Sequence, residues 1–164
     1  MQTFRIKNAD GEGAIEFFER NPPDPDRPMV TCWVKLTGPG LSATRRLSMV
    51  PELEESPPPL FAEMAERWRG WEGELCWSPR DGGLTLRCSQ DHSGHVSIRI
   101  TLDRGSLDQD WVVQSTVMTE AGQLDAITRS AKTFFGVCRE NTVDPGSRLT
   151  RMVDTVKQIV RNWN

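Results

Sequence analysis

Residues 68–102, WRGWEGELCWSPRDGGLTLRCSQDHSGHVSIRITL, contain the pattern that decides the fold. Trp68 and Trp71 come at the end of a predicted helix, and the rest reads as consecutive antiparallel strands. Asp81-Gly82 is typical of a two-residue type I′ hairpin turn, because both central positions of that turn need a positive φ. The stretch therefore predicts a β-hairpin followed by a further strand.

The register that this turn implies pairs Leu75 with Cys88 and Trp77 with Leu86. Side chains alternate between the two faces of a strand, so one face of the hairpin is apolar and the other polar. The apolar face consists of Leu75, Trp77, Leu84, Leu86 and Cys88. The next strand continues it with Val96, Ile98, Ile100 and Leu102. One buried and one wet face predict an antiparallel meander.

Alternation and helical spacing extend this organisation to the rest of the chain. Further strands are predicted at 3–7, 14–19, 30–37, 41–49 and 111–119. Helices are predicted from Pro57, after the N-cap Ser56, to the residue before Gly70, and at 121–139 and 147–163. Because strands come in sequential runs, the order favours the α+β class. We expect one antiparallel, meander-rich sheet of about eight strands, with about three helices packed mainly on one face. The second choice is a curved sheet or half-barrel that wraps around the helices.

Length, charge and hydropathy limit the function classes. The 164 residues suggest one domain over 1–164. The net charge of −3 argues against nucleic acid as a partner, because phosphate binding favours a basic excess. No stretch approaches the roughly 18 apolar residues of a membrane span, and the amino-terminal MQTFRIK lacks the apolar core of a signal peptide. We expect a cytoplasmic monomer or homodimer with no cofactor and no membrane partner.

Cys88, His92 and His95 lie close together in the sequence, and with Asp91 they would supply ligands to a transition metal. Their spacing matches no standard zinc module, and the predicted register turns Cys88 toward the core and His95 outward. The alternative is a tight turn with Gly94 at positive φ, closed by a hydrogen bond from a histidine. No catalytic motif such as GxSxG or HExxH accompanies these residues, so no catalytic residue is predicted.

Tryptophans are the first candidates for binding. The chain has six tryptophans and no tyrosine, and Trp71 and Trp77 read either as core fillers or as an aromatic binding wall. Trp33 falls on the polar face of its strand. There it either lies under the stem of Lys35 or Arg46 or marks a contact surface.

Acidic residues in two proline-rich segments, 21–28 and 51–59, are the second candidates. Proline fixes φ and removes a backbone donor, so both segments are predicted to be loops. Their carboxylates form either an anionic patch that speeds association with a basic partner, or ordinary solvated loop charge. The residues are Asp24, Asp26, Glu52, Glu54 and Glu55.

A family of small bacterial domains of unknown function resembles this chain over residues 60–136. The resemblance rests on Trp68-x-Gly70-Trp71-x-Gly73, Leu84-x-Leu86, Asp91-x-x-Gly94-His95-Val96-x-Ile98-x-Ile100, Trp111 and Gly122-Gln123-Leu124. That family is similar in layout to the WapI-type immunity proteins, which are thought to neutralise toxins carried by neighbouring cells. The resemblance implies turn and packing positions, and it brings no catalytic residue with it.

Together these features predict a non-enzymatic, cytoplasmic protein-interaction domain. In its most specific form the hypothesis is an immunity protein that binds a toxin domain. The alternative is a small-molecule or metal-binding domain, with a minor enzymatic activity. It would use a pocket between the sheet and the helices near Trp71, Trp77 and His95.

Overall fold

The computed structural model describes residues 2–21, 29–50, 56–104 and 111–136, and these form two four-stranded antiparallel sheets with two α-helices. The first sheet has the order β1 (Phe4–Lys7), β2 (Ala14–Asn21), β3 (Val30–Gly38), β4 (Leu41–Met49). The second has the order β5 (Leu75–Trp77), β6 (Leu84–Gln90), β7 (His95–Asp103), β8 (Val112–Glu120). Helix α1 (Pro58–Glu66) connects the sheets, and a 3-10 turn, η2 (Ala121–Gln123), leads into α2 (Leu124–Phe135).

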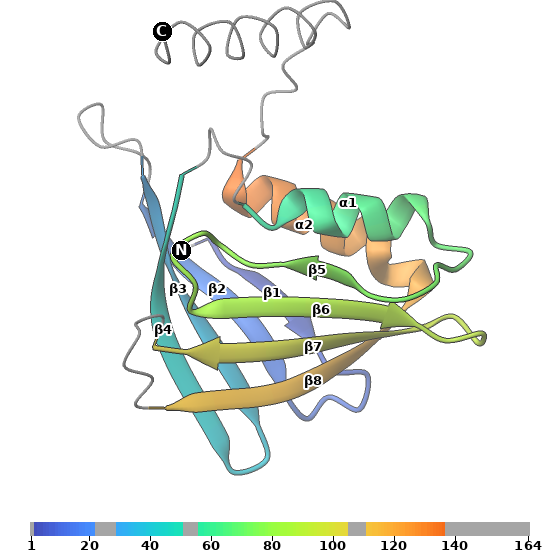
Figure 1. Ribbon diagram of the computed structural model, residues 1–164, viewed down its shortest axis with the longest axis horizontal. Helices are drawn as coiled ribbons and strands as arrows, with labels where there is room; N and C mark the ends of the chain where they lie inside the picture. Colours follow the sequence, from blue (N-terminus) through green and yellow to red (C-terminus); the bar gives the residue numbers. More distant parts are fainter. Residues whose placement is uncertain (1, 22–28, 51–55, 105–110, 137–164) are drawn as a thin grey trace, which may run out of the picture.

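The α+β class is confirmed, but the prediction of one eight-stranded sheet is wrong. Alternation along a strand shows which face is buried, and it does not show where a hydrogen-bonded ladder ends. Here the ladder ends at β4, because α1 carries the chain across to a second sheet (Figure 1). The apolar face of each sheet then packs against that of the other, so both sheets contribute to one core.

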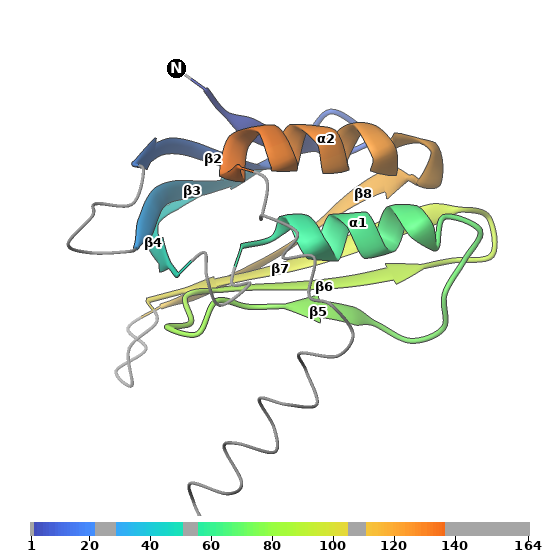
Figure 2. The same ribbon diagram turned by 90° about the horizontal axis from the view of Figure 1, so that it is seen from above.

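The helices cover the side between the two sheets rather than one sheet face (Figures 1 and 2). Seen from above, α1 and α2 lie side by side, with α1 next to β5 and α2 next to β1. The predicted helix at 147–163 lies outside the described residues. Within the described part of the chain, no helix combines the length and the apolar character that crossing a membrane requires.

The register predicted for the central hairpin is confirmed: Leu75 pairs with Cys88 and Trp77 with Leu86. The turn itself differs from the predicted type I′. Gly82 has a φ of 70°, whereas Asp81 does not have a positive φ. The second positive φ is that of Gly83, at 87°. The register is unchanged because the pairing stops at Trp77 and Leu86, which leaves equal numbers of residues on either side of Asp81-Gly82.

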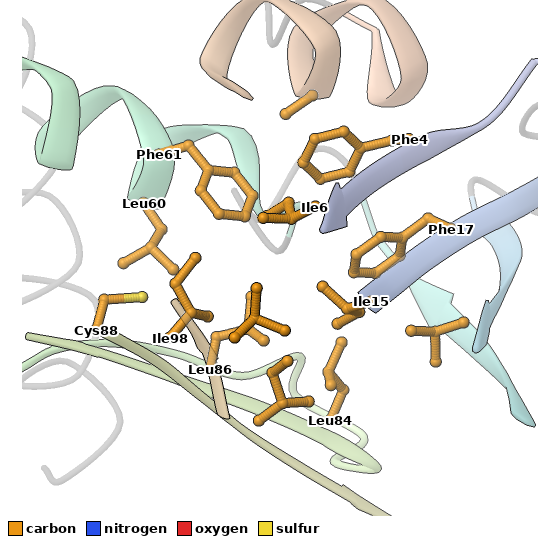
Figure 3. Close-up of a cluster of buried hydrophobic side chains, with 14 of the residues drawn as sticks. Phe4, Ile6, Ile15, Phe17, Leu60, Phe61, Leu84, Leu86, Cys88 and Ile98 are labelled. Carbon is orange, nitrogen blue, oxygen red and sulfur yellow. The ribbon is translucent and has the colours of Figure 1, made fainter. Parts of the chain in front are cut away.

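Aromatic rings fill the centre of the core (Figure 3). The Phe4 ring centroid lies 5.6 Å from that of Phe17 and 5.5 Å from that of Phe61, which joins β1, β2 and α1. The two helices are held together by Thr128, whose buried hydroxyl lies 2.9 Å from the Phe61 carbonyl oxygen and 2.8 Å from that of Leu124. Helix position and sheet packing are therefore coupled through α1.

Helix α1 ends earlier than predicted. Its last residue is Glu66 rather than one next to Gly70, and Trp68 is 54% exposed instead of packed on the apolar face. Glu63 and Arg67 form an ion pair at 2.8 Å on the solvent-exposed side of the helix. The tryptophan spacing was compatible with one more helical turn, but the helix ends at Glu66, and the Trp68 carbonyl accepts a hydrogen bond from the Gln90 side chain of β6 at 2.9 Å.

Side-chain and backbone contacts join the two sheets at the end of β1. The backbone N–H of Met118 on β8 donates to Asn8 Oδ1 at 2.7 Å, and the N–H of Ala9 donates to the Met118 carbonyl at 2.9 Å. On the β4 side, the guanidinium of Arg45 donates to the carbonyl of Asp103. Arg45 interrupts the apolar pattern of β4 because it reaches across to the second sheet.

Candidate functional site

The outer face of the first sheet carries an aromatic pair. Trp33 on β3 lies directly opposite Phe18 on β2 and Arg46 on β4, and both aromatic side chains are half-buried. The solvent-exposed face of an antiparallel sheet usually carries polar side chains, so two adjacent aromatic rings on it are unusual. Arg46 is one of the two residues expected to lie next to Trp33. The rings of Phe18 and Trp33 are only half-buried, so part of their surface is open to a partner.

Basic side chains surround this pair. Arg5, Glu16 and Lys35 form one cross-strand row next to it, and Lys7 and Arg46 extend the same face. Among these residues Glu16 is the single carboxylate, so the face is basic although the whole chain is acidic. We call Phe18, Trp33 and these five charged residues the β1–β4 face. The sequence signal for Phe18 was the pair Phe17-Phe18, which must place one ring on each side of a strand.

The acidic residues expected to bind a partner, Asp24, Asp26, Glu52, Glu54 and Glu55, lie outside the described residues. The chain enters and leaves the first segment, and enters the second, at one end of the first sheet, where Asn21 pairs with Thr31 and Thr31 with Ser48. After the second segment it continues into α1. Both acidic segments are therefore attached at the same end of the sheet that carries the β1–β4 face.

Trp71 and Trp77 pack against the edge of the core. Both side chains are half-buried, and Trp71 Nε1 donates to the carbonyl of Cys88 at 3.3 Å. Trp77 points toward the core side of the second sheet, opposite Leu86, whereas His95 is exposed on the outer side. The three residues expected to line one pocket are thus divided between two faces.

The structure does not bring Cys88, His92 and His95 together as metal ligands. Cys88 is fully buried on the core face, and both histidines are exposed. No group of three His, Cys, Asp or Glu side chains suited to a metal ion occurs among the described residues. Burial raises the pKa of the Cys88 thiol to about 12, so the thiolate that a metal requires is disfavoured.

His95 instead closes the turn between β6 and β7. Its Nδ1 lies 3.0 Å from Asp91 Oδ2 and its Nε2 lies 3.5 Å from Glu120 Oε1. Asp91 Oδ1 also accepts the backbone N–H of Ser93 at 2.8 Å, and Gly94 has a φ of 85°. The hydrogen bond that His95 Nδ1 donates to the Asp91 carboxylate, and then the charge of Glu120, raise the pKa of His95. The pKa of Asp91 is lowered, mainly by the backbone N–H of His95. The expectation of a structural turn is confirmed.

A groove between β1 and α2 was not predicted from the sequence. It has a volume of about 430 Å³ and is lined by consecutive residues 5–9 of the β1 segment, by Thr119, and by Gln123, Ala126, Ile127 and Ser130 of α2. The spacing of the α2 residues is that of one helical face. Residues about 120 positions apart in the sequence form it, so no local pattern indicates it.

The comparisons with known proteins show the family. The model of the Family of unknown function (DUF6228) matches residues 6–137. No curated protein matches the chain. One similar solved structure is the "Structure of the plant transcriptional regulator PBF-2", with 10% sequence identity and a TM-score of 0.44 over 80% of this chain and 78% of that one.

Proposed function

This chain belongs to the Family of unknown function (DUF6228), and we propose that it is a non-enzymatic protein-interaction domain that binds its partner through the β1–β4 face. The observation that carries the proposal is the half-buried pair of Phe18 and Trp33 on an outer sheet face. Aromatic and arginine side chains supply most of the binding energy in protein interfaces, and Arg46 lies next to this pair.

In its specific form, the proposal is that the domain acts in the cytoplasm as an immunity protein for a toxin domain. The layout that resembles WapI-type immunity proteins supports this form. The segments with Asp24, Asp26, Glu54 and Glu55 support it as well, because they attach at one end of the sheet that carries the β1–β4 face. A basic patch of the toxin domain would contact those carboxylates, and apolar or acidic side chains elsewhere on that domain would cover Trp33 and the cations around it.

Capture from a lysate of the native host, followed by binding measurements with the purified partner, tests the proposal. Trp33→Ala should weaken the affinity by at least about tenfold, which is the size expected of a hot-spot side chain. Trp68→Ala is the matched control, because it removes an exposed tryptophan beyond the end of α1. Unfolding curves of both variants establish that they are folded.

Charge reversal at Asp24, Asp26, Glu54 and Glu55 in the same assay should slow association at low salt and leave dissociation nearly unchanged. Equal affinity of the Trp33→Ala variant and the wild type for the captured partner would contradict the proposal. If charge reversal does not change the association rate, the acidic segments are not part of the binding surface. The β1–β4 face would then remain the proposed contact.

A further inference from the structure

Among the residues that the structure describes, no strand pairs with the outer edge of β1 along Phe4–Lys7. β1 is the first strand of its sheet, with β2 as its hydrogen-bonded strand neighbour. The N–H of Asn8 donates toward β2, to Gly13, and the N–H of the next residue, Ala9, donates away from β2, to Met118. Because backbone direction alternates along a strand, Arg5 and Lys7 point their N–H and C=O groups away from β2, as Ala9 does. These groups face the groove beside α2.

The groove follows this edge for a short distance. At one end β8 pairs with Ala9 through Met118, and beyond Met118 the chain turns away into η2 and α2. At the other end the Gln2 side chain donates to the Thr133 carbonyl of α2 at 2.9 Å. Residues 5–9 line the groove on this side, and the part before the contact of Ala9 with Met118, residues 5–8, is about four residues long, which is roughly 13 Å of strand. That length suits a short extended segment.

The chemistry of the lining indicates the charge of an occupant. Arg5 and Lys7 are the charged residues of the lining, and both are exposed. The opposite wall contributes Gln123, Ala126, Ile127 and Ser130, which are polar or apolar but uncharged. Glu16, the cross-strand neighbour of Arg5, balances part of that charge. The groove thus combines two cations, backbone donors and acceptors and an apolar wall.

We propose that the β1 edge takes an extended, acidic segment of a partner protein as an added strand between β1 and α2. The proposal deepens the proposed function, because it rests on the partner being a protein. The segment would continue the sheet from the position where β8 leaves it. Arg5 and Lys7 would each give one donor and one acceptor, and acidic side chains of the segment would lie near their cationic groups.

A synthetic probe tests this proposal without the natural partner. The probe is a fluorescent, terminally blocked peptide of about ten residues that alternates glutamate and valine, an arrangement suited to strand addition. Its binding is measured by anisotropy, and amide hydrogen exchange at Arg5 and Lys7 is followed by NMR. We expect saturable binding with slower exchange at both amides. The same peptide with lysine in place of glutamate should bind at least about tenfold more weakly.

Two variants close the site by different routes. Lys7→Pro removes an N–H on the open side of the edge strand, a side on which proline is tolerated, so the pairing with β2 is retained. Ser130→Trp fills the groove from α2, and Lys132→Trp on the same helix is the control, because Lys132 is exposed and does not line the groove. Lys7→Pro and Ser130→Trp should weaken the probe by at least about tenfold, and Lys132→Trp should not.

The outcomes separate this inference from the proposed function. Probe binding that survives in Trp33→Ala shows that strand addition at Arg5 and Lys7 does not depend on the aromatic pair. A probe that binds equally well to wild type and to Ser130→Trp overturns the strand-addition proposal and leaves the β1–β4 face untouched. If citrate displaces the probe completely and the exchange at Arg5 and Lys7 does not change, the groove holds small anions and the strand-addition proposal is wrong.

Discussion

His95 shows how a single exposed side chain links turn geometry to pH. It lies between the carboxylates of Asp91 and Glu120, and its hydrogen bond with Asp91 raises its pKa in the folded protein. Protonation therefore favours the folded state. The resulting stabilisation is fully present below the unfolded-state pKa, about 6.5, and it is lost as the pH rises through the higher folded-state pKa.

We predict that His95→Gln lowers the unfolding free energy more at about pH 5.5 than at about pH 8. Urea unfolding at the two pH values measures the difference. An NMR titration should also show a lower His95 pKa in Asp91→Asn, which removes the negative charge and leaves an oxygen that can accept the backbone N–H groups. A His95 pKa that stays the same in Asp91→Asn would contradict this account of the turn.

Single residues also show what sequence patterns can and cannot reveal about the site. Trp33 was predicted to point outward because its neighbours alternate, and it does. Phe18 was missed because its strand was predicted without assigning which of its side chains face outward. The separation of Cys88 from His95 followed from the hairpin register, which the structure confirms. The groove at Arg5 and Lys7 could not be predicted from the sequence, because it depends on where α2 packs.

At the scale of elements, Thr128 joins α2 to α1. Its hydroxyl is buried and shared between the carbonyls of Phe61 and Leu124, whereas the hydroxyl of the exposed Thr133 donates to the Arg129 carbonyl of its own helix at 2.9 Å. We predict that Thr128→Val lowers the unfolding free energy by about 1 kcal/mol, because it leaves the Phe61 carbonyl without this donor.

Thr133→Val is the matched control and should change stability by less than about 0.5 kcal/mol, as is usual for surface substitutions. Chemical denaturation of both variants gives the comparison. If the two substitutions lower the unfolding free energy equally, the hydrogen bond from Thr128 to the Phe61 carbonyl does not stabilise the protein beyond the bonds within α2.

Strands were easier to predict than helix ends and turns. The spans of β3 and β4 agree closely with the alternation of their apolar residues. The end of α1 was misplaced, because Trp68 continues the helical spacing of the apolar residues although the helix ends at Glu66. The hairpin register was correct with the wrong turn, since Gly82 takes the positive φ without Asp81.

At the scale of the molecule, the division into two sheets determines which surfaces are available to a partner. The core faces of both sheets are covered by each other and by the helices, so two outer sheet faces remain. The outer face of the second sheet carries Arg87 and Arg99, which share the carboxylate of Glu74 at 3.5 and 3.7 Å. The first sheet instead presents the aromatic pair of Phe18 and Trp33.

No local pattern in the sequence separates one sheet of eight strands from two sheets of four. In both arrangements each strand alternates in the same way, and the difference lies in whether β4 pairs with β5. Helix α1 between them decides this, because its buried residues Leu60, Phe61 and Met64 need a core between two layers. The sequence alone does not reveal this requirement, which depends on how the two sheets pack in the folded structure.

Site-specific photo-crosslinking in the native host tests the central claim most directly. A photoreactive residue at Thr44, exposed on the outer side of the first sheet, should crosslink to one partner protein. The same residue at Thr116, exposed on the outer side of the second sheet, should not. That result would identify the β1–β4 face as the contact surface. A partner crosslinked from Thr116 and not from Thr44 would contradict the account.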